Sequence, residues 1–184
     1  MKIRLEKDTQ VKVLCVGMIL LLVGILIPLF WISTYNFKSM DDLSYAKNAE
    51  LVWQESHSVL KVMGSQIKDT WEIYQEWQGT YFGLWFFTSM IGIFGESAYY
   101  MGTVFSLGGF VLAELFLLMV ILVKGLGADK YRAAILSISC IAMQVLLTPY
   151  PVEAYFWFCG AVLYTFIHVL ALFLLTILFL QIQN

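Results

Sequence analysis

The chain has 184 residues, which allows one ordinary domain, with a formal net charge of −2 and an isoelectric point near 5.6. Hydrophobic residues make up 60% of the chain and charged residues 13%, and the mean hydropathy is +0.79, whereas a soluble domain carries roughly 25% charged residues. This composition disfavours a water-soluble enzyme, a nucleic-acid-binding protein and a disordered regulator, and it predicts an all-α protein whose main solvent is lipid.

The first predicted membrane span covers residues 13–32, within the charge-free interval between Lys12 and Lys38. Its apolar run is longer than the roughly 7–15 residues of a signal-peptide core, and Trp31 and Tyr35 follow it instead of a small-residue cleavage site. We therefore expect a retained transmembrane helix.

A polar segment, residues 35–97, follows and contains eight of the thirteen acidic residues. A short helix is predicted from near Asp42, with a break at Gly64 and Ser65. From residue 60 on, the apolar positions 60, 63, 67, 71, 74, 77 and 81 have the spacing of one helix face. Trp and Tyr on that face suit the lipid headgroup plane, although the same face could pack on the spans as core. The apolar stretch 81–95 is predicted as a re-entrant or interfacial element.

Three further spans are predicted at residues 98–123, 131–147 and 154–180, which are separated by a short basic turn and by a proline-containing turn at 149–153. The expected fold class is an all-α membrane protein, residues 1–184 forming a single membrane domain. It has about four transmembrane helices, with one or two interfacial amphipathic helices in the first extracytoplasmic loop.

Basic residues predict the orientation of the spans, because Lys and Arg concentrate on the cytoplasmic side. The N-terminal tail has four of them and the turn 124–132 has three, against four spread through the long segment 35–97. We expect a multi-pass protein of the cell membrane with both termini in the cytoplasm and residues 35–97 outside.

The adjacent acids Asp41 and Asp42, just after the first span, are the sharpest chemical feature of the sequence. Such a pair could act as a general base or hold a divalent cation, and the alternative is that Ser39 or Asp41 simply caps a helix. Glu96 and Glu153 are predicted at the outer ends of spans, near the level of the pair. Glu114 falls within a span, where we expect a hydrogen bond to a neighbouring helix.

The cysteines and histidines carry little chemistry. Cys15, Cys140 and Cys159 lie in apolar runs without a CxxC or Cys/His cluster, so neither a zinc site nor a disulfide is predicted. His57 is expected to be a solvated polar residue, and His168 a contact between packed helices.

A resemblance rests on three stretches. They are Asp41-Asp42 with Tyr45, the run from Trp77 through Gln78 to Tyr81, and Glu153 with Phe156, Trp157, Gly160 and Ala161. In this order, around a basic turn, the chain resembles the N-terminal part of a family of bacterial multi-spanning proteins. These are grouped with the GT-C-type, polyprenyl-phosphate-sugar-dependent glycosyltransferases.

The resemblance implies inverting transfer of a sugar from a lipid phosphate to an acceptor hydroxyl at the outer leaflet. Asp41 or Asp42 would accept the hydroxyl proton, and a metal is compatible with this class but not required. The implied substrate-binding residues are Tyr45, Trp77, Gln78, Tyr81, Glu96, Glu153 and Trp157.

Such enzymes have more spans than the four predicted here, so we expect an N-terminal part of a longer protein or a truncated, inactive relative. The expected partners are membrane lipids, a lipid-linked sugar donor and further transmembrane helices or subunits, and no nucleic acid. Two alternatives stay open: a non-enzymatic membrane assembly or lipid-binding partner, and a transporter fragment that uses Glu114 as a coupling residue.

Overall fold

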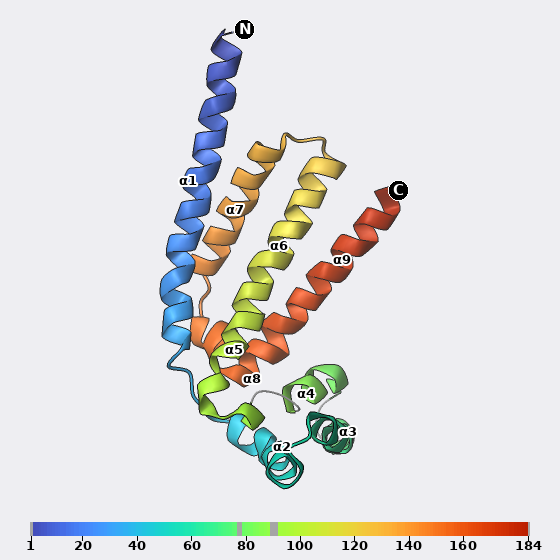
Figure 1. Cartoon of the computed structure of the whole chain (residues 1–184). Helices are drawn as coiled ribbons and strands as arrows, with labels where there is room; N and C mark the ends of the chain where they lie inside the picture. The colour runs from blue at the N-terminus through green and yellow to red at the C-terminus, as the bar shows by residue number, and fades with distance from the viewer. Residues whose placement is uncertain (1, 77–78, 89–91, 184) are drawn as a thin grey trace. The chain divides into compact units, whose positions relative to one another are not determined.

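Every regular element that the structure describes is helical, as the sequence predicts (Figure 1). The structure is a computed structural model that describes residues 2–76, 79–88 and 92–183. The longer helices are α1 (Lys2–Ser33), α2 (Asp42–Ser56), α3 (Val59–Glu76), α4 (Tyr81–Thr88), α6 (Gly109–Val120), α7 (Lys130–Leu146) and α9 (Ile167–Gln183). The shorter helical segments are η1 (Gly92–Phe94), η2 (Glu96–Ala98), α5 (Tyr100–Thr103), η3 (Val104–Gly108), η4 (Ile121–Gly125), η5 (Val152–Phe156), α8 (Phe158–Gly160) and η6 (Ala161–Phe166).

Three continuous helical runs within the described residues are long and apolar enough to cross a membrane: Asp8–Ser33, Glu96–Gly125 and Phe158–Gln183. They cover three of the predicted spans and indicate a multi-pass membrane protein. Only 11% of the most apolar stretch of the first run is buried within the protein. Because an apolar surface of this size is not stable in water, lipid is its natural contact. The remaining predicted span, 131–147, corresponds to α7, which has 17 residues.

The residues pack into two compact units. The first contains residues 1–31, 108–149 and 168–184. Within it, α6 and α7 run side by side (Figure 1) and are joined by η4 and the turn 126–129. Asp129 caps α7 because its Oδ1 accepts the backbone N–H groups of Tyr131 and Arg132 at 3.1 and 3.2 Å.

Two expectations for polar side chains are confirmed in this unit. Glu114 of α6 is buried, and its Oε1 accepts a hydrogen bond from Gln144 Nε2 of α7 at 3.4 Å, so a neighbouring helix supplies the partner. The ring of His168 packs 6.2 Å from that of Phe110. All three described cysteines are free thiols.

The second unit contains residues 32–107 and 150–167, and α2 and α3 lie next to each other in it. The predicted start of α2 near Asp42 is confirmed. The predicted break at Gly64 and Ser65 is wrong, because α3 continues through both residues and the chain turns instead at His57, which has a φ of 46°. A Cβ added at Gly64 meets no described atom within 4 Å, so this glycine has no steric reason to end the helix.

The helix α3 is amphipathic as predicted, but its apolar stripe is not the face that packs. Val62, Gln66 and Thr70 are fully buried, whereas Leu60, Ile67 and Trp71 of the predicted apolar face are 81%, 50% and 50% exposed. The alternative in which these apolar side chains serve as core is therefore wrong for them. The apolar stripe is therefore exposed and can contact another apolar phase, such as lipid.

The last helical run begins at Phe158 rather than at the predicted residue 154. Trp157 has an extended backbone, with φ −72° and ψ 116°, and separates η5 from α8. The chain then passes so close to itself that a Cβ added at Gly160 would lie 2.5 Å from the carbonyl oxygen of Glu153. This break fixes where the first turn of α8 begins.

Gly160→Ala is expected to destabilise the protein by about 1–3 kcal/mol, because a backbone carbonyl cannot move aside as a flexible side chain can. Thermal unfolding in detergent, followed by circular dichroism, measures the effect. Gly64→Ala is the matched control, since its methyl group enters open space in a helix and should be neutral or stabilising by up to about 1 kcal/mol. Equal stability of the two variants would contradict the close approach at Gly160.

Candidate functional site

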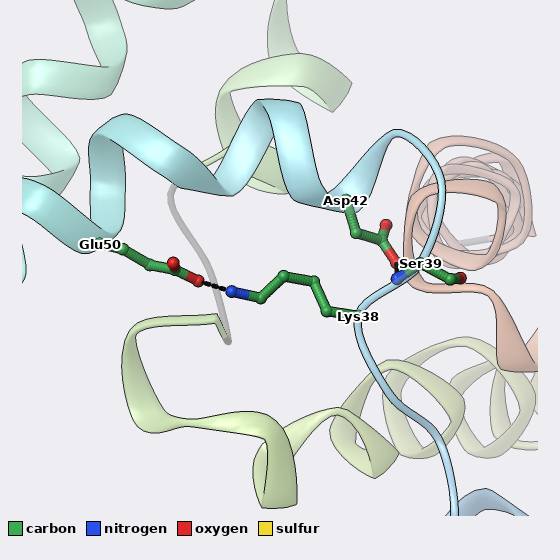
Figure 2. A network of polar contacts seen from close by, with 4 residues as sticks. All are labelled: Lys38, Ser39, Asp42 and Glu50. Atoms are coloured by element: carbon green, nitrogen blue, oxygen red, sulfur yellow. Dashed lines mark hydrogen bonds and ion pairs between the residues drawn. The ribbon is translucent and has the colours of Figure 1, made fainter.

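Asp42 is the most constrained acid of the described residues. Its side chain is 1% exposed, and its carboxylate accepts two backbone hydrogen bonds. Oδ2 accepts the N–H of Ser39 at 3.2 Å, and Oδ1 accepts the N–H of Cys159 at 3.0 Å. Figure 2 shows the carboxylate turned toward the Ser39 amide. Asp42 therefore ties the loop after the first span to the start of α8.

The position of Cys159 explains why its N–H is available. Because Trp157 is extended, Cys159 lies in the first turn of a helix, where backbone N–H groups have no partner within the helix. A carboxylate is a favourable partner there, because it both accepts the hydrogen bond and complements the positive end of the helix dipole. Asp42 caps α8 from a different part of the chain.

Burial raises the pKa of Asp42 from 3.8 to about 6. The hydrogen bonds from Ser39 and Cys159 act in the opposite direction, as does the charge of Lys38, while the neighbouring charge of Asp41 adds to the increase. Desolvation is the largest of these effects. It raises the pKa because it penalises the ionised form of the carboxyl group.

Lys38 does not pair directly with Asp42. It forms an ion pair and hydrogen bond with Glu50, which lies about two turns further along α2 than Asp42 (Figure 2). The Lys38 and Glu50 side chains are 15% and 28% exposed. Both line a pocket of about 270 Å³ together with Trp53, Ile93 and Glu96. The cation next to the acid pair is thus largely neutralised by a different acid.

Asp41, the other member of the pair, is exposed and is the N-cap residue of α2. Its backbone carbonyl accepts the hydroxyl of Ser44 at 2.9 Å, and its side chain makes no capping hydrogen bond. Tyr45 lies one turn along α2, and burial, with a contribution from the Asp41 charge, raises the pKa of its phenol to about 12. The two adjacent acids therefore have different environments, one fixed in the interior and one free to meet a solute.

The residues predicted to bind substrate do not line one pocket. Tyr45 lines a groove between α2 and α3, whereas Glu96 lines the pocket beside Lys38. Tyr81 packs edge-on against Trp71 and Tyr74, with ring centroids 6.3 and 6.0 Å away.

The other predicted binding residues have separate surroundings. Glu153 is exposed on η5. The indole Nε1 of Trp157 is buried and has no hydrogen-bond partner among the residues described. Trp77 and Gln78 lie outside the described residues.

The charges of Asp42, Glu50 and Glu96 all act on the phenol of Tyr99. Tyr99 itself is buried in a cluster with Phe158, Cys159 and Val162. Asp42 is joined to this cluster by its hydrogen bond from the Cys159 N–H. In the part of the chain that the structure describes, no three His, Cys, Asp or Glu side chains are placed to hold a metal ion.

Sequence reasoning missed the groove between α2 and α3. Its polar side chains include Asn48, Gln66 and Asp69, and Asn48 Nδ2 donates to Asp69 Oδ2 at 2.5 Å. The spacing of Val62, Gln66 and Thr70, four residues apart, is the signal that could have identified the packed face of α3.

No family model, curated protein or solved structure matches this chain.

The protein is expected to lose stability as the pH rises from about 4 to 7. The folded state holds a proton on Asp42 up to about pH 6, while the unfolded state releases it near 3.8, so the stabilisation present below 3.8 is lost as the pH passes 6. Unfolding temperatures measured across this range should fall more steeply for the wild type than for Asp42→Asn, which cannot titrate there.

Asp42→Asn also replaces one acceptor oxygen by an amide donor, and this should cost about 1–3 kcal/mol below pH 4. Asp41→Asn is the control and should keep most of the wild-type slope. Parallel profiles for the wild type and Asp42→Asn would rule out the raised pKa.

Proposed function

We propose that this chain is a membrane module of a glycosyltransferase that uses a polyprenyl-phosphate sugar as its donor. The observation that carries the proposal is the acid pair that directly follows the first apolar run. Its second member, Asp42, is held by two backbone amides, and its first, Asp41, is exposed. A general base needs both a fixed backbone position and access to its substrate, and the two residues together supply these.

In the proposed reaction, the exposed Asp41 carboxylate accepts the proton of the acceptor hydroxyl. The hydroxyl oxygen forms a bond to the anomeric carbon of the sugar while the bond from that carbon to the lipid phosphate breaks. The configuration inverts and polyprenyl phosphate leaves with the bonding electron pair. Asp42 is a positioning residue, because it acts through the loop and not on the substrate.

The proposed substrate-binding roles follow from the resemblance to GT-C-type glycosyltransferases. Tyr45, Glu96 and Glu153 are proposed to hydrogen-bond sugar hydroxyls together with Gln78, and Trp77, Tyr81 and Trp157 to contact the sugar ring or the prenyl chain. The rings of Trp71, Tyr74 and Tyr81 form a partly exposed aromatic surface, which supports contact with an apolar or ring-shaped ligand.

The proposed membrane arrangement has four crossings, with α7 as the crossing added to the three long apolar runs. Its 17 residues are at the lower limit for a span. Residues 35–97 are proposed to lie outside the cell, with the exposed stripe of α3 in the headgroup plane. The 81% exposure of Leu60 and 50% exposure of Trp71 support this placement.

A non-enzymatic role in membrane assembly or lipid binding is the second candidate. It is favoured by the two hydrogen bonds that already occupy the Asp42 carboxylate, because a carboxylate used in this way stabilises the fold. The two candidates differ in whether Asp41 has a chemical role.

The membrane arrangement is tested by labelling intact cells with a membrane-impermeant maleimide. In a variant that lacks the native cysteines, Glu55→Cys in α2 should be labelled, and Ala128→Cys in the turn before α7 should be labelled only after the cells are permeabilised. The reverse pattern would refute the proposed orientation.

Glycosyl transfer is tested by incubating membranes that contain the protein with a panel of radiolabelled polyprenyl-phosphate hexoses. Asp41→Asn should lower the rate of label transfer by about 10²–10⁴-fold, the usual contribution of a general base. Glu55→Gln, an exposed acid on the same helix, should leave the rate unchanged. Full activity of the double variant Asp41→Asn and Asp42→Asn, or no transfer by the wild type from any donor, would favour the non-enzymatic candidate.

A further inference from the structure

The groove between α2 and α3 has a volume of about 270 Å³ and lies entirely within the second unit. Tyr45 and Asn48 line it from α2, and Gln66, Asp69, Glu72 and Glu76 line it from α3. Asp69, Glu72 and Glu76 are three and four residues apart, a spacing that places side chains on one face of a helix. This volume is large enough for a small organic group.

The groove is strongly acidic. It contains three carboxyl side chains, and the rest of its described lining is polar or apolar rather than basic. The neighbouring Lys68 forms an ion pair with Glu72 at 3.7 Å, but the two side chains are 81% and 58% exposed, so solvent weakens their attraction. A cation that entered the groove would therefore find uncompensated negative charge.

Gln66 provides an independent sign of a ligand. Its side chain is fully buried, and its Oε1 has no hydrogen-bond donor in the described part of the chain. Its Nε2 donates to Ser65 Oγ at 3.4 Å. A buried amide oxygen without a donor is unfavourable, because it has lost its hydrogen bonds to water. A ligand in the groove should therefore offer an N–H or O–H group as well as positive charge.

These requirements distinguish an organic cation from a metal ion. The described carboxylates, together with the His and Cys side chains, form no group of three that could surround one metal ion. A primary ammonium group carries a positive charge and three N–H donors, and so suits separate acceptors. The phenol of Tyr45 adds an aromatic ring, which attracts cations.

We propose that the groove between α2 and α3 binds a primary ammonium group of a small organic molecule. Its acceptors are the amide oxygen of Gln66 and the carboxylates of Asp69 and Glu72. The ammonium group belongs either to an amino sugar or to an ethanolamine headgroup. This site does not depend on glycosyl transfer, because it requires binding alone.

The binding test uses the purified full chain in neutral detergent micelles and saturation-transfer NMR at pH 6. Glucosamine is compared with glucose, which has a hydroxyl in place of the ammonium group, and glycerophosphoethanolamine is compared with glycerophosphocholine, which has no N–H donor. We expect one ammonium compound to bind at least about 10-fold more tightly than its matched partner. The pair that shows the difference identifies the source of the amine.

The matched variants locate the site. Glu72→Gln and Gln66→Leu should each weaken binding of the preferred compound by about 10-fold or more, whereas Glu55→Gln, an acid of α2 outside the groove, should not. Glu72 is exposed, so its variant keeps the test valid even where Gln66→Leu fails to fold.

Absence of binding by both ammonium compounds would overturn the proposal. Equal affinity for glucose and glucosamine, together with equal affinity for the choline and ethanolamine compounds, would overturn it as well. Loss of sugar transfer in the preceding assay, with binding intact, would refute the proposed enzyme and leave this site standing.

Discussion

Asp42 joins two segments of the second unit, through backbone N–H groups of Ser39, three residues away, and of Cys159, 117 residues away. Moving a carboxylate out of water costs free energy, and here two amides and the start of a helix repay part of that cost. The arrangement requires the extended backbone at Trp157, which exposes the first turn of α8. Burial prevails over these hydrogen bonds and raises the pKa of Asp42 to about 6.

Asp42 is also the first residue of α2, on which both proposed sites lie. Asp41 is the N-cap residue of α2, Tyr45 lies one turn further along it, and Asn48 lines the groove against α3. A molecule that fills the groove would therefore lie along the helix that presents the exposed acid. The proposed transfer and the proposed ammonium site are physically compatible, although each stands on different atoms.

The local elements were largely predictable. Hydropathy located the long apolar runs, and the spacing of apolar residues predicted α3 as an amphipathic helix, because both properties depend on near neighbours. Its break was misplaced, since a glycine in an exposed helix costs little and the left-handed His57 has no comparable sequence signal. The start of the last run was also misplaced, because its boundary depends on the extended backbone of Trp157.

The sequence by itself determined that the chain is helical, apolar and rich in acids between its first two apolar runs, since composition and periodicity are local properties. Only the tertiary structure decided that Asp42 is buried while its neighbour Asp41 is exposed, because the difference depends on a distant amide, that of Cys159. It likewise decided that Gln66 faces the interior and Trp71 does not. Which side of an amphipathic helix packs depends on the shape of its neighbours, and helical spacing alone does not encode that shape.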